Sequence, residues 1–296
     1  MPTSQPYIKL AAIASNEAFY LPLWVYHHFS MGFDILEIWI NHTTDNSWNV
    51  INKLKLRYGN HLIIIDADND ALDCRKKNIS FQKYAYNEIY KKTLEQNFTH
   101  LMFLDIDELW IDRDFKSSIK DFISEHKDVN ISCFQWFLDL ADKSITLDTF
   151  KFQSEITLQR NRHIKSLINL KSDIKSIGIH NHISNNGSYI LGDGSKLNFG
   201  SSVDEGQISI DYYKSRINKI DRYFIFHRLY KSSLEYTASL LKSNLQTTES
   251  GVLKSNRKGY KRVVPQKFLL TWQIPNNKKR QLYDKGHKRQ LNAVTY

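Results

Sequence analysis

Short apolar runs alternate with helix-like stretches through the first hundred residues, and this alternation constrains the fold more than any other feature. Runs typical of buried strands are found at residues 8–14, 35–41, 62–65 and 101–104. Amphipathic stretches typical of helices separate them, at about residues 19–29, 48–58 and 80–96. Strands that alternate with helices predict a mostly parallel sheet flanked by helices, which is an α/β fold. In such sheets ligands bind beyond the carboxyl ends of the strands.

The positive charge of the chain is concentrated at its end. Residues 252–296 hold 12 of the 41 Lys and Arg residues and only one of the 31 acidic residues, Asp284. This segment therefore carries 12 − 1 = +11, and residues 1–251 carry 29 − 30 = −1. We expect a domain at residues 1–251 and a basic helical or irregular C-terminal extension at residues 252–296.

The surroundings of the protein are indicated by its cysteines and its hydropathy. Cys74 and Cys133 are too few for a disulfide framework, which favours a reducing compartment. No apolar run approaches the ~18 residues that span a bilayer. We expect a cytoplasmic protein. Basic clusters flank the aromatic segment 268–272, which suits a peripheral position at the inner face of the membrane. The alternative is a solvated end that packs Trp272 on the body. Nucleic-acid binding is not expected, because no RNA-recognition or zinc signature is present.

Two carboxylates follow the fourth apolar run. Asp105 and Asp107 come after residues 101–104, and in an extended chain residues i and i+2 lie on one side, ~6 to 7 Å apart. Such a pair suits a divalent cation that keeps open positions for a substrate diphosphate. The alternative is a chance Asp-x-Asp triplet without a ligand. Glu108 is expected to support this loop rather than to bind the ion itself.

The usual phosphate-binding loops are absent from the sequence. No Gly-x-Gly-x-x-Gly follows the first apolar run, and no Gly-Lys-Thr or Gly-Lys-Ser loop is present. Phosphate charge would have to be met by a metal and by side chains. This combination indicates a nucleoside-diphosphate sugar as the ligand.

An ordered set of motifs resembles a known family. The set comprises Ser15-Asn16-Glu17, Tyr20-Leu21-Pro22-Leu23-Trp24, Asn41 to Ser47, Leu104 to Leu109, Lys165-Ser166, His180-x-His182, His227 and Lys231-Ser232. In this order the motifs are similar to glycosyltransferase family 2-like proteins close to family 92, which have the GT-A fold. The sequence departs from that family at Leu23, at Arg228 and in residues 136–142.

The resemblance implies a Rossmann-like GT-A domain with a donor half at about residues 1–115 and an acceptor half at about residues 116–251. It implies a metal-dependent transfer of a hexose, such as galactose from a UDP-sugar, to a hydroxyl of a glycan or lipid-linked acceptor. Inversion at the anomeric carbon and a role in surface polysaccharide assembly are also implied. A nucleotidyltransferase and a non-catalytic sugar-binding scaffold remain as alternatives.

The resemblance also implies roles for individual residues. The nucleoside pocket would be lined by Asn16, Glu17, Asp45 and Asp66. Mn²⁺ or Mg²⁺ would be held by Asp105, Asp107, His180 and His182, with Asp105 also near the donor. His227 would also lie near the donor, and the candidates to neutralise the diphosphate are Lys165, Lys231 and Arg228. For the catalytic base, the position after a predicted strand favours Asp139, with Asp142, Asp204 and Glu205 as alternatives.

Several of these residues also have structural alternatives. Asp45 could cap backbone amides in its turn, and Asp66 could merely terminate its strand. His180 and His182 alternate in what we interpret as one strand, with both imidazoles on one side, and they could be ordinary hydrogen-bonded residues.

Overall fold

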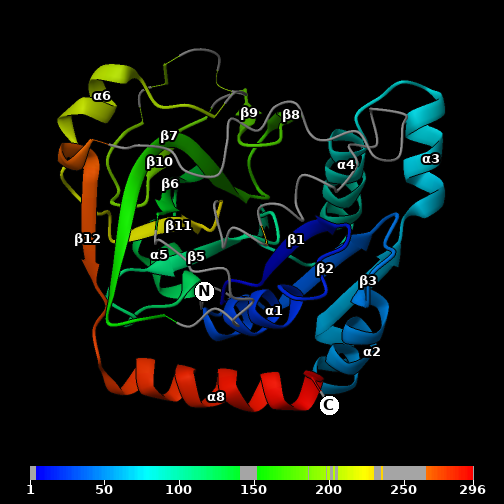
Figure 1. The fold of residues 1–296 in the computed structure, drawn as a ribbon. Coiled ribbons are helices and arrows are strands. Elements are labelled where there is room, and N and C mark those ends of the chain that lie inside the picture. The colour runs from blue at the N-terminus through cyan, green and yellow to red at the C-terminus, as the bar shows by residue number, and fades with distance from the viewer. Residues whose placement is uncertain are drawn as a thin grey trace.

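The computed structural model describes residues 5–140, 152–185, 187–197, 199–200, 203, 206–229, 235 and 265–295. The predicted α/β alternation is confirmed in the first half of the chain (Figure 1). The elements in order are β1 (Ile8–Ala14), α1 (Leu21–Ser30), β2 (Ile35–Ile40), α2 (Ser47–Tyr58), β3 (Leu62–Asp66), α3 (Asp68–Lys76), α4 (Phe81–Leu94) and β4 (His100–Phe103). Helix α3 is additional, because the sequence pattern predicted no helix between the third strand and the helix at 80–96.

The second half of the described chain contains more strands than helices. Its elements are β5 (Glu108–Asp112), α5 (Ile119–Glu125), β6 (Ile131–Asp139), β7 (Glu155–Asn169), β8 (Ile174–Ile177), β9 (His182–Ser184), β10 (Tyr189–Leu191), α6 (Ile210–Ser215), β11 (Tyr223–His227), β12 (Leu269–Gln273) and α8 (Lys278–Thr295). No helix in the part of the chain that the structure describes is long and apolar enough to cross a membrane.

The central sheet is mixed but mostly parallel. Its main order is β3-β2-β1-β4-β7-β6-β11-β5, with β10 beside β6 and β12 beside β7. The pairings make eight of these ten described strands run in one direction, and β5 and β7 run in the other. Strand β1 pairs in parallel with β2 on one side and with β4 on the other, so the order of the strands reverses at β1. Such a reversal opens a crevice between the carboxyl ends of β1 and β4.

Side chains of alternate residues bury both faces of this sheet. In β1, Ile8, Leu10 and Ala12 belong to the core that includes α1, α2 and α5, whereas Ala11 belongs to the core that includes α4. The period of two in a strand produces this division. Apart from Lys9, which pairs with Glu37 at 2.8 Å, the strand is apolar because helices cover both sides of it.

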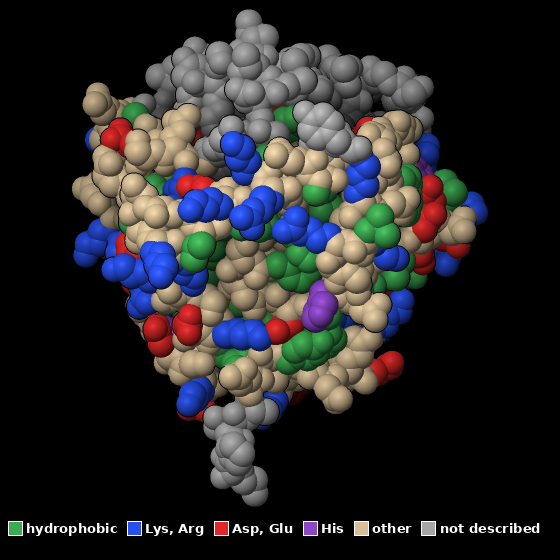
Figure 2. Space-filling model, turned by 90° about the horizontal axis from the view of Figure 1, so that it is seen from below, with side chains coloured by type: hydrophobic (Ala, Val, Ile, Leu, Met, Phe, Trp, Pro, Cys, Tyr) green, Lys and Arg blue, Asp and Glu red, His purple; other side chains and the backbone are tan. Residues whose placement is uncertain are grey.

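Residues 265–295 are folded onto the rest of the chain. Strand β12 pairs with β7, and α8 runs along the underside of the molecule in Figure 1, next to α1 and α2. On the inner side of α8, Tyr283 lies against Tyr26, with ring centroids 5.2 Å apart, and its backbone oxygen accepts a 2.9 Å hydrogen bond from the Tyr26 hydroxyl. Seen from below, Lys and Arg side chains gather on this surface (Figure 2). Residues 252–264 of the predicted extension lie outside the described residues.

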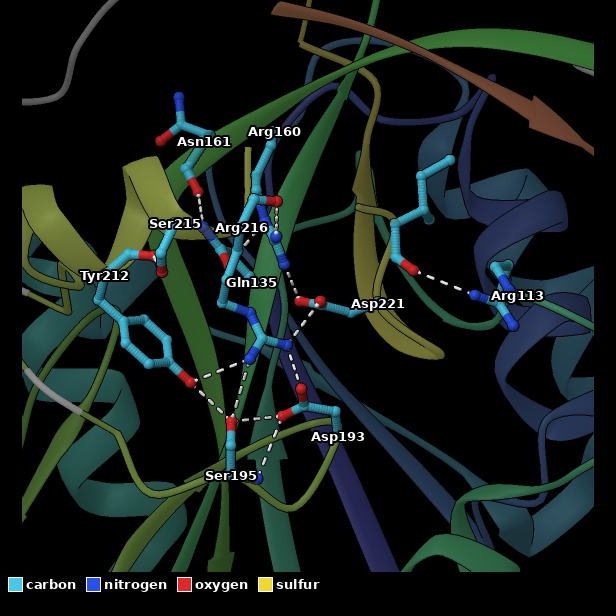
Figure 3. A network of polar contacts seen from close by, with 11 residues as sticks. Arg113, Gln135, Arg160, Asn161, Asp193, Ser195, Tyr212, Ser215, Arg216 and Asp221 are labelled. Carbon is cyan, nitrogen blue, oxygen red and sulfur yellow. Dashed lines mark hydrogen bonds and ion pairs between the residues drawn. The ribbon is translucent and has the colours of Figure 1, made fainter. Parts of the chain in front are cut away.

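A buried ionic network holds α6 and the turn after β10 against the sheet (Figure 3). The Arg160 guanidinium of β7 pairs with Asp221, and both side chains are at most 2% exposed. Asp221 also pairs with Arg216 at 3.1 Å, and Arg216 in turn pairs with Asp193. These charges compensate each other, because an isolated ion would be strongly disfavoured at such depth. The network fixes segments that come from four parts of the second half of the chain.

Candidate active site

The Asp-x-Asp loop lies at the reversal of strand order. Strand β4 ends at Phe103, and the backbone N–H of Leu104 still donates to Ala11 of β1 at 3.1 Å. Asp105 follows directly, and its backbone oxygen accepts a hydrogen bond from the Trp24 indole at 3.1 Å. The chain therefore places Asp105 at the crevice between β1 and β4, whereas the backbone oxygen of Asp107 accepts from the backbone N–H of Arg228, directly after β11, at 3.0 Å.

The Asp105 carboxylate is held from two sides. Its Oδ1 accepts weak hydrogen bonds from Gln82 at 3.3 Å and from the Tyr86 hydroxyl at 3.5 Å, both on α4. Its Oδ2 accepts from the Lys165 amine of β7 at 3.2 Å. Asp105 is thus oriented by groups that are 19 to 60 residues away in the sequence.

Lys165 lies between two carboxylates, and its side chain is 1% exposed. Its Nζ is 3.2 Å from Asp105 and 3.4 Å from the buried Glu108. Burial disfavours the ammonium, but Asp105 and Glu108 together raise the pKa of Lys165 above its usual value, so the amine stays charged. Burial in turn raises the pKa of Glu108 to about 7, although Lys165 opposes this shift. Glu108 also accepts from the backbone N–H of Asp105 at 3.0 Å, which supports the loop.

Asp107 lies close to a histidine of strand β11. His227 ends β11, and its Nε2 is 3.6 Å from Oδ1 of Asp107. Burial disfavours the imidazolium, but the nearby Asp107 carboxylate raises the pKa of His227 above its ordinary value. The antiparallel pairing of β11 with β5, which sets His227 opposite Glu108, produces this contact.

The donor atoms at this place suit a shared rather than a closed metal site. The described residues contain no group of three His, Cys, Asp or Glu side chains that could hold an ion by itself. Asp107 and His227 together supply one carboxylate oxygen and one imidazole nitrogen. Mg²⁺ is commonly bound by one or two protein ligands together with water and substrate phosphates. Asp107 and His227 therefore fit a divalent ion that arrives with a diphosphate.

The predicted strand with both His180 and His182 differs from the structure. His180 lies in a bend before β9, and its ring is close to Trp136 and His163, with centroid separations of 5.3 and 5.2 Å. His182 begins β9, is 1% exposed and packs against Phe103 with centroids 5.8 Å apart. The two rings therefore have different surroundings, because the strand starts two residues later than the alternation indicated.

Burial lowers the pKa of both His180 and His182 to about 3, with a further contribution from Lys165. Both imidazoles are therefore neutral at pH 7 and could accept a ligand through a ring nitrogen. Their role as metal ligands stays a prediction.

The predicted nucleoside residues lie on the rim formed by the ends of β1, β2 and β3. Asn16 has a positive φ of 55° and its side-chain oxygen accepts from the backbone N–H groups of Thr44 and Asp45 at 2.7 and 3.1 Å. Asp45 accepts from the backbone of Ala18 at 3.0 Å and of Ser47 at 2.9 Å. Asn16 and Asp45 thus join the turns after β1 and β2. Asp45 accepts from backbone N–H groups, as expected if it stabilises its turn.

Glu17 and Asp66 are also positioned by this rim. The Glu17 backbone N–H donates to the Ser47 hydroxyl at 3.1 Å, and Asp66 is exposed and accepts from the Asp68 backbone at 3.1 Å. Both carboxylates lie at the carboxyl edge of the sheet, as the sequence predicted. Their role in nucleoside binding stays a prediction.

The remaining predicted residues lie farther along the chain. Asp139 is the last residue of β6 and is 2% exposed. Lys231 lies outside the described residues. The structure therefore leaves the identity of the catalytic base as a prediction.

The sequence prediction missed residues whose role depends on distant contacts. Gln82 and Tyr86 are four residues apart on α4, so they share a helix face, but nothing in the sequence indicated that this face meets Asp105. Trp136 lies beside His227, with ring centroids 4.4 Å apart, and beside His163 at 5.0 Å. A pairing of separated strands creates this cluster, and no local motif announces it.

No protein-family model and no curated protein matches the chain. Among solved structures, the chain is similar to galactosyltransferase LgtC with donor and acceptor sugar analogues, at 18% identity over 55% of this chain and 58% of that chain, with a TM-score of 0.30. It is similar to S. aureus TarS 1–349 with UDP, at 14% identity over 55% and 47% of the chains, with a TM-score of 0.32.

A third similar structure is glucosyl-3-phosphoglycerate synthase from Mycobacterium tuberculosis with Mn²⁺, UDP and phosphoglyceric acid, at 10% identity over 45% and 43% of the chains, with a TM-score of 0.26. The chain thus spans about half the length of these structures. Because these TM-scores are low, conclusions about this chain rest on its own topology and on its own site.

Proposed function

We propose that the chain is a metal-dependent glycosyltransferase of the GT-A type, related to the family 2-like proteins close to family 92. It would transfer a hexose, such as galactose, from a UDP-sugar to a hydroxyl of a glycan or lipid-linked acceptor. The observation that carries the proposal is the Asp107–His227 pair, 3.6 Å apart, beside the strand reversal between β1 and β4. One carboxylate and one imidazole leave most coordination positions of a cation open. The pair therefore suits a cation that also binds a diphosphate better than it suits a closed structural metal site.

The residues around the pair divide the work of donor binding. Asp107 and His227 would hold Mn²⁺ or Mg²⁺, which, when bound, supplies positive charge to stabilise the leaving diphosphate. Asp105 is oriented by Lys165 and would bind the donor through its remaining lone pairs. The rim residues Asn16, Glu17, Asp45 and Asp66 would shape the nucleoside pocket, and Lys231 would add charge at the phosphates. His180 and His182 would contribute to the metal site as further nitrogen donors.

The transfer step requires a base that removes the acceptor proton. Asp139 is our candidate for this role, and inversion at the anomeric carbon follows if one base acts and no covalent intermediate forms. We place the reaction in surface polysaccharide assembly at the inner face of the membrane. The support for this location is the basic surface of α8.

Donor turnover tests the proposal. Purified full chain would be incubated with UDP-galactose, UDP-glucose and UDP-N-acetylglucosamine in Mn²⁺, in Mg²⁺ or in a chelator, and release of UDP followed. We expect metal-dependent release from one donor, and a loss of at least 100-fold in Asp107→Asn. The control is Asp128→Asn, an exposed carboxylate before the amino end of β6 and therefore at the opposite edge of the sheet from the end of β4, which should leave the rate unchanged. Release that is insensitive to the chelator and to Asp107→Asn would contradict the proposal.

A further inference from the structure

Trp136 is an exception in the central strand β6. Its eight neighbours in β6 are all buried, whereas the Trp136 side chain is partly exposed. A large aromatic side chain that is partly exposed in the middle of a buried strand presents apolar surface to solvent. Apolar and aromatic surface with a few polar groups is typical of ligand sites.

Three histidines surround the Trp136 ring. The ring centroids of His227, His163 and His180 lie 4.4, 5.0 and 5.3 Å from it. These residues come from β11, β7 and the bend before β9, so the cluster is assembled by the tertiary fold. Gly206 closes in on His180, and a Cβ atom there would lie 2.5 Å from the Cβ of His180.

Several polar atoms of this cluster lack a hydrogen-bond partner. They are Nε1 of Trp136, Nδ1 of His180 and Nδ1 of His227, all buried and unpaired among the described residues. A buried polar atom without a partner is costly, so native structures usually satisfy it with water or a ligand. The indole can only donate, whereas a neutral imidazole nitrogen can donate or accept. A ligand with hydroxyl groups offers both functions.

The cluster favours a neutral ligand over an anion. The nearby Lys165 amine is already paired with Asp105 and Glu108. The His227 imidazole faces Asp107, which offsets its charge. A neutral ring with an apolar face and several hydroxyls matches these conditions.

We propose that Trp136, His163 and His180 form a binding floor for the pyranose ring of a neutral sugar. The C–H face of the ring would pack on the face of the indole, and its hydroxyls would pair with the unpaired Nδ1 atoms of His180 and His227. The inference rests on the proposed function, because it places a sugar next to the Asp107–His227 pair. The ring belongs either to the UDP-sugar or to the acceptor.

Binding of sugars to variants of the full chain tests the floor. Calorimetry in Mn²⁺ would compare UDP, the three UDP-sugars and p-nitrophenyl glycosides of galactose and glucose. The variants are Trp136→Leu, which removes the ring and the N–H, and Trp136→Phe, which keeps a smaller ring. Trp48→Leu, at a partly buried indole on α2, is the matched control, and thermal unfolding confirms that each variant is folded.

The result identifies the source of the sugar. If it is the donor, Trp136→Leu keeps its affinity for UDP within twofold and loses at least tenfold for the UDP-sugar. If the sugar belongs to the acceptor, Trp136→Leu keeps its affinities for UDP and for the UDP-sugar within twofold, and its affinity for the glycoside falls at least tenfold. In either case Trp136→Phe is intermediate and Trp48→Leu is unchanged.

Unchanged affinities for every sugar in folded Trp136→Leu would overturn the inference, and so would a wild-type chain that binds none of these sugars. Wild-type protein that binds glycosides through Trp136 but binds neither UDP nor a UDP-sugar would instead overturn the proposed function and leave the sugar floor standing.

Discussion

The Glu108 carboxyl shows how one buried residue can affect both the site and its pH response. It is completely buried between Lys165 and the backbone of Asp105, and one of its oxygens, Oε1, has no hydrogen-bond partner among the described residues. Burial raises its pKa from 4.5 to about 7 despite the nearby amine. Its protonation state therefore changes near neutral pH.

Replacing Glu108 by Gln should change the pH dependence of stability. The pKa of Glu108 is higher in the folded chain than in the unfolded one, so the folded chain keeps the proton up to a higher pH. Between pH 4.5 and about 7 the unfolded chain loses this proton first, and the free energy of unfolding therefore falls as the pH rises. The Glu108→Gln variant lacks this term. The difference in free energy of unfolding between variant and wild type should therefore move in the variant's favour by about 3 kcal/mol between pH 4.5 and 8.

Denaturant unfolding at several pH values measures this difference. The comparison uses the difference between the two chains because buried histidines such as His27 have lowered pKa values and act in the opposite direction in both. A difference that is independent of pH would contradict the prediction.

Asp45 separates a structural role from a nucleotide-binding role. Its carboxylate accepts from backbone N–H groups of Ala18 and Ser47, so Asp45→Ala should lower the free energy of unfolding by about 1 kcal/mol. If the carboxylate only holds the turn, the affinity for UDP at a temperature far below unfolding stays within twofold. Chemical denaturation and calorimetry measure the two effects. A loss of UDP affinity of tenfold or more without a loss of stability would show that Asp45 binds the nucleotide.

At the residue scale, local pattern predicted the carboxylates but not their partners. Asp105 and Asp107 are adjacent to a strand, so the end of an apolar run was enough to locate them. Their partners Lys165 and His227 come from strands 60 and 120 residues farther along the chain. Only the pairing of β7 with β4 and of β11 with β5 brings these residues together.

At the scale of elements, the ionic network of Figure 3 predicts a large effect of one substitution. Removing the Asp221 carboxylate leaves the buried Arg160 guanidinium without its main counter-charge. Asp221→Ala should therefore lower the free energy of unfolding by about 3 to 5 kcal/mol. Asp73→Ala, which removes an exposed partner of Lys76, is the matched control and should change it by less than about 0.5 kcal/mol.

Urea denaturation of the two variants compares these free energies. The double variant Arg160→Met/Asp221→Leu should recover much of the loss, because both buried charges are then absent. Equal losses in Asp221→Ala and Asp73→Ala would contradict the account of the network.

The prediction of elements succeeded where the sequence has a clear apolar run or amphipathic stretch and failed where tertiary contacts decide. Strands β1 to β4 follow apolar runs, and helices α1, α2 and α4 follow amphipathic stretches. Helix α3 is short and polar, with mostly exposed residues, so its sequence showed no apolar stripe. Strand β9 has three residues, and it is stabilised by its pairing with β8. A pattern so short is ambiguous without its partner.

At the scale of the whole molecule, the described part of the C-terminal segment packs on α1 and α2 of the first half of the chain. Helix α8 turns Tyr283 and Gln290 inwards, and these side chains contact α1 and α2. Its outer side carries exposed cations and Leu282, which is 60% exposed. Charge counting predicted that this segment is basic. It could not indicate that one face of α8 packs on the core while the opposite face carries the exposed cations.

The outer side of α8 should bind anionic membranes. Lys285, Lys288 and Arg289 are exposed there, and each basic residue near an anionic surface contributes about 1 kcal/mol. Replacing all three by Glu should reduce sedimentation with vesicles of 30% phosphatidylserine at least tenfold, and high salt should have the same effect. The control replaces the exposed Arg75, Lys76 and Lys77 of the α3 end by Glu. Equal losses in both triple variants would show that only net charge matters, and would contradict a role for α8.

The central claim is that Asp107 and His227 bind a divalent ion together with a nucleoside diphosphate. The most direct measurement is calorimetric titration of UDP into the wild-type chain and into Asp107→Asn, with Mn²⁺ or with a chelator. The account predicts UDP binding to the wild-type chain that requires Mn²⁺ and is at least tenfold weaker in Asp107→Asn. UDP that binds equally well in the chelator and in the variant, or that does not bind to the wild-type chain in Mn²⁺, would contradict it.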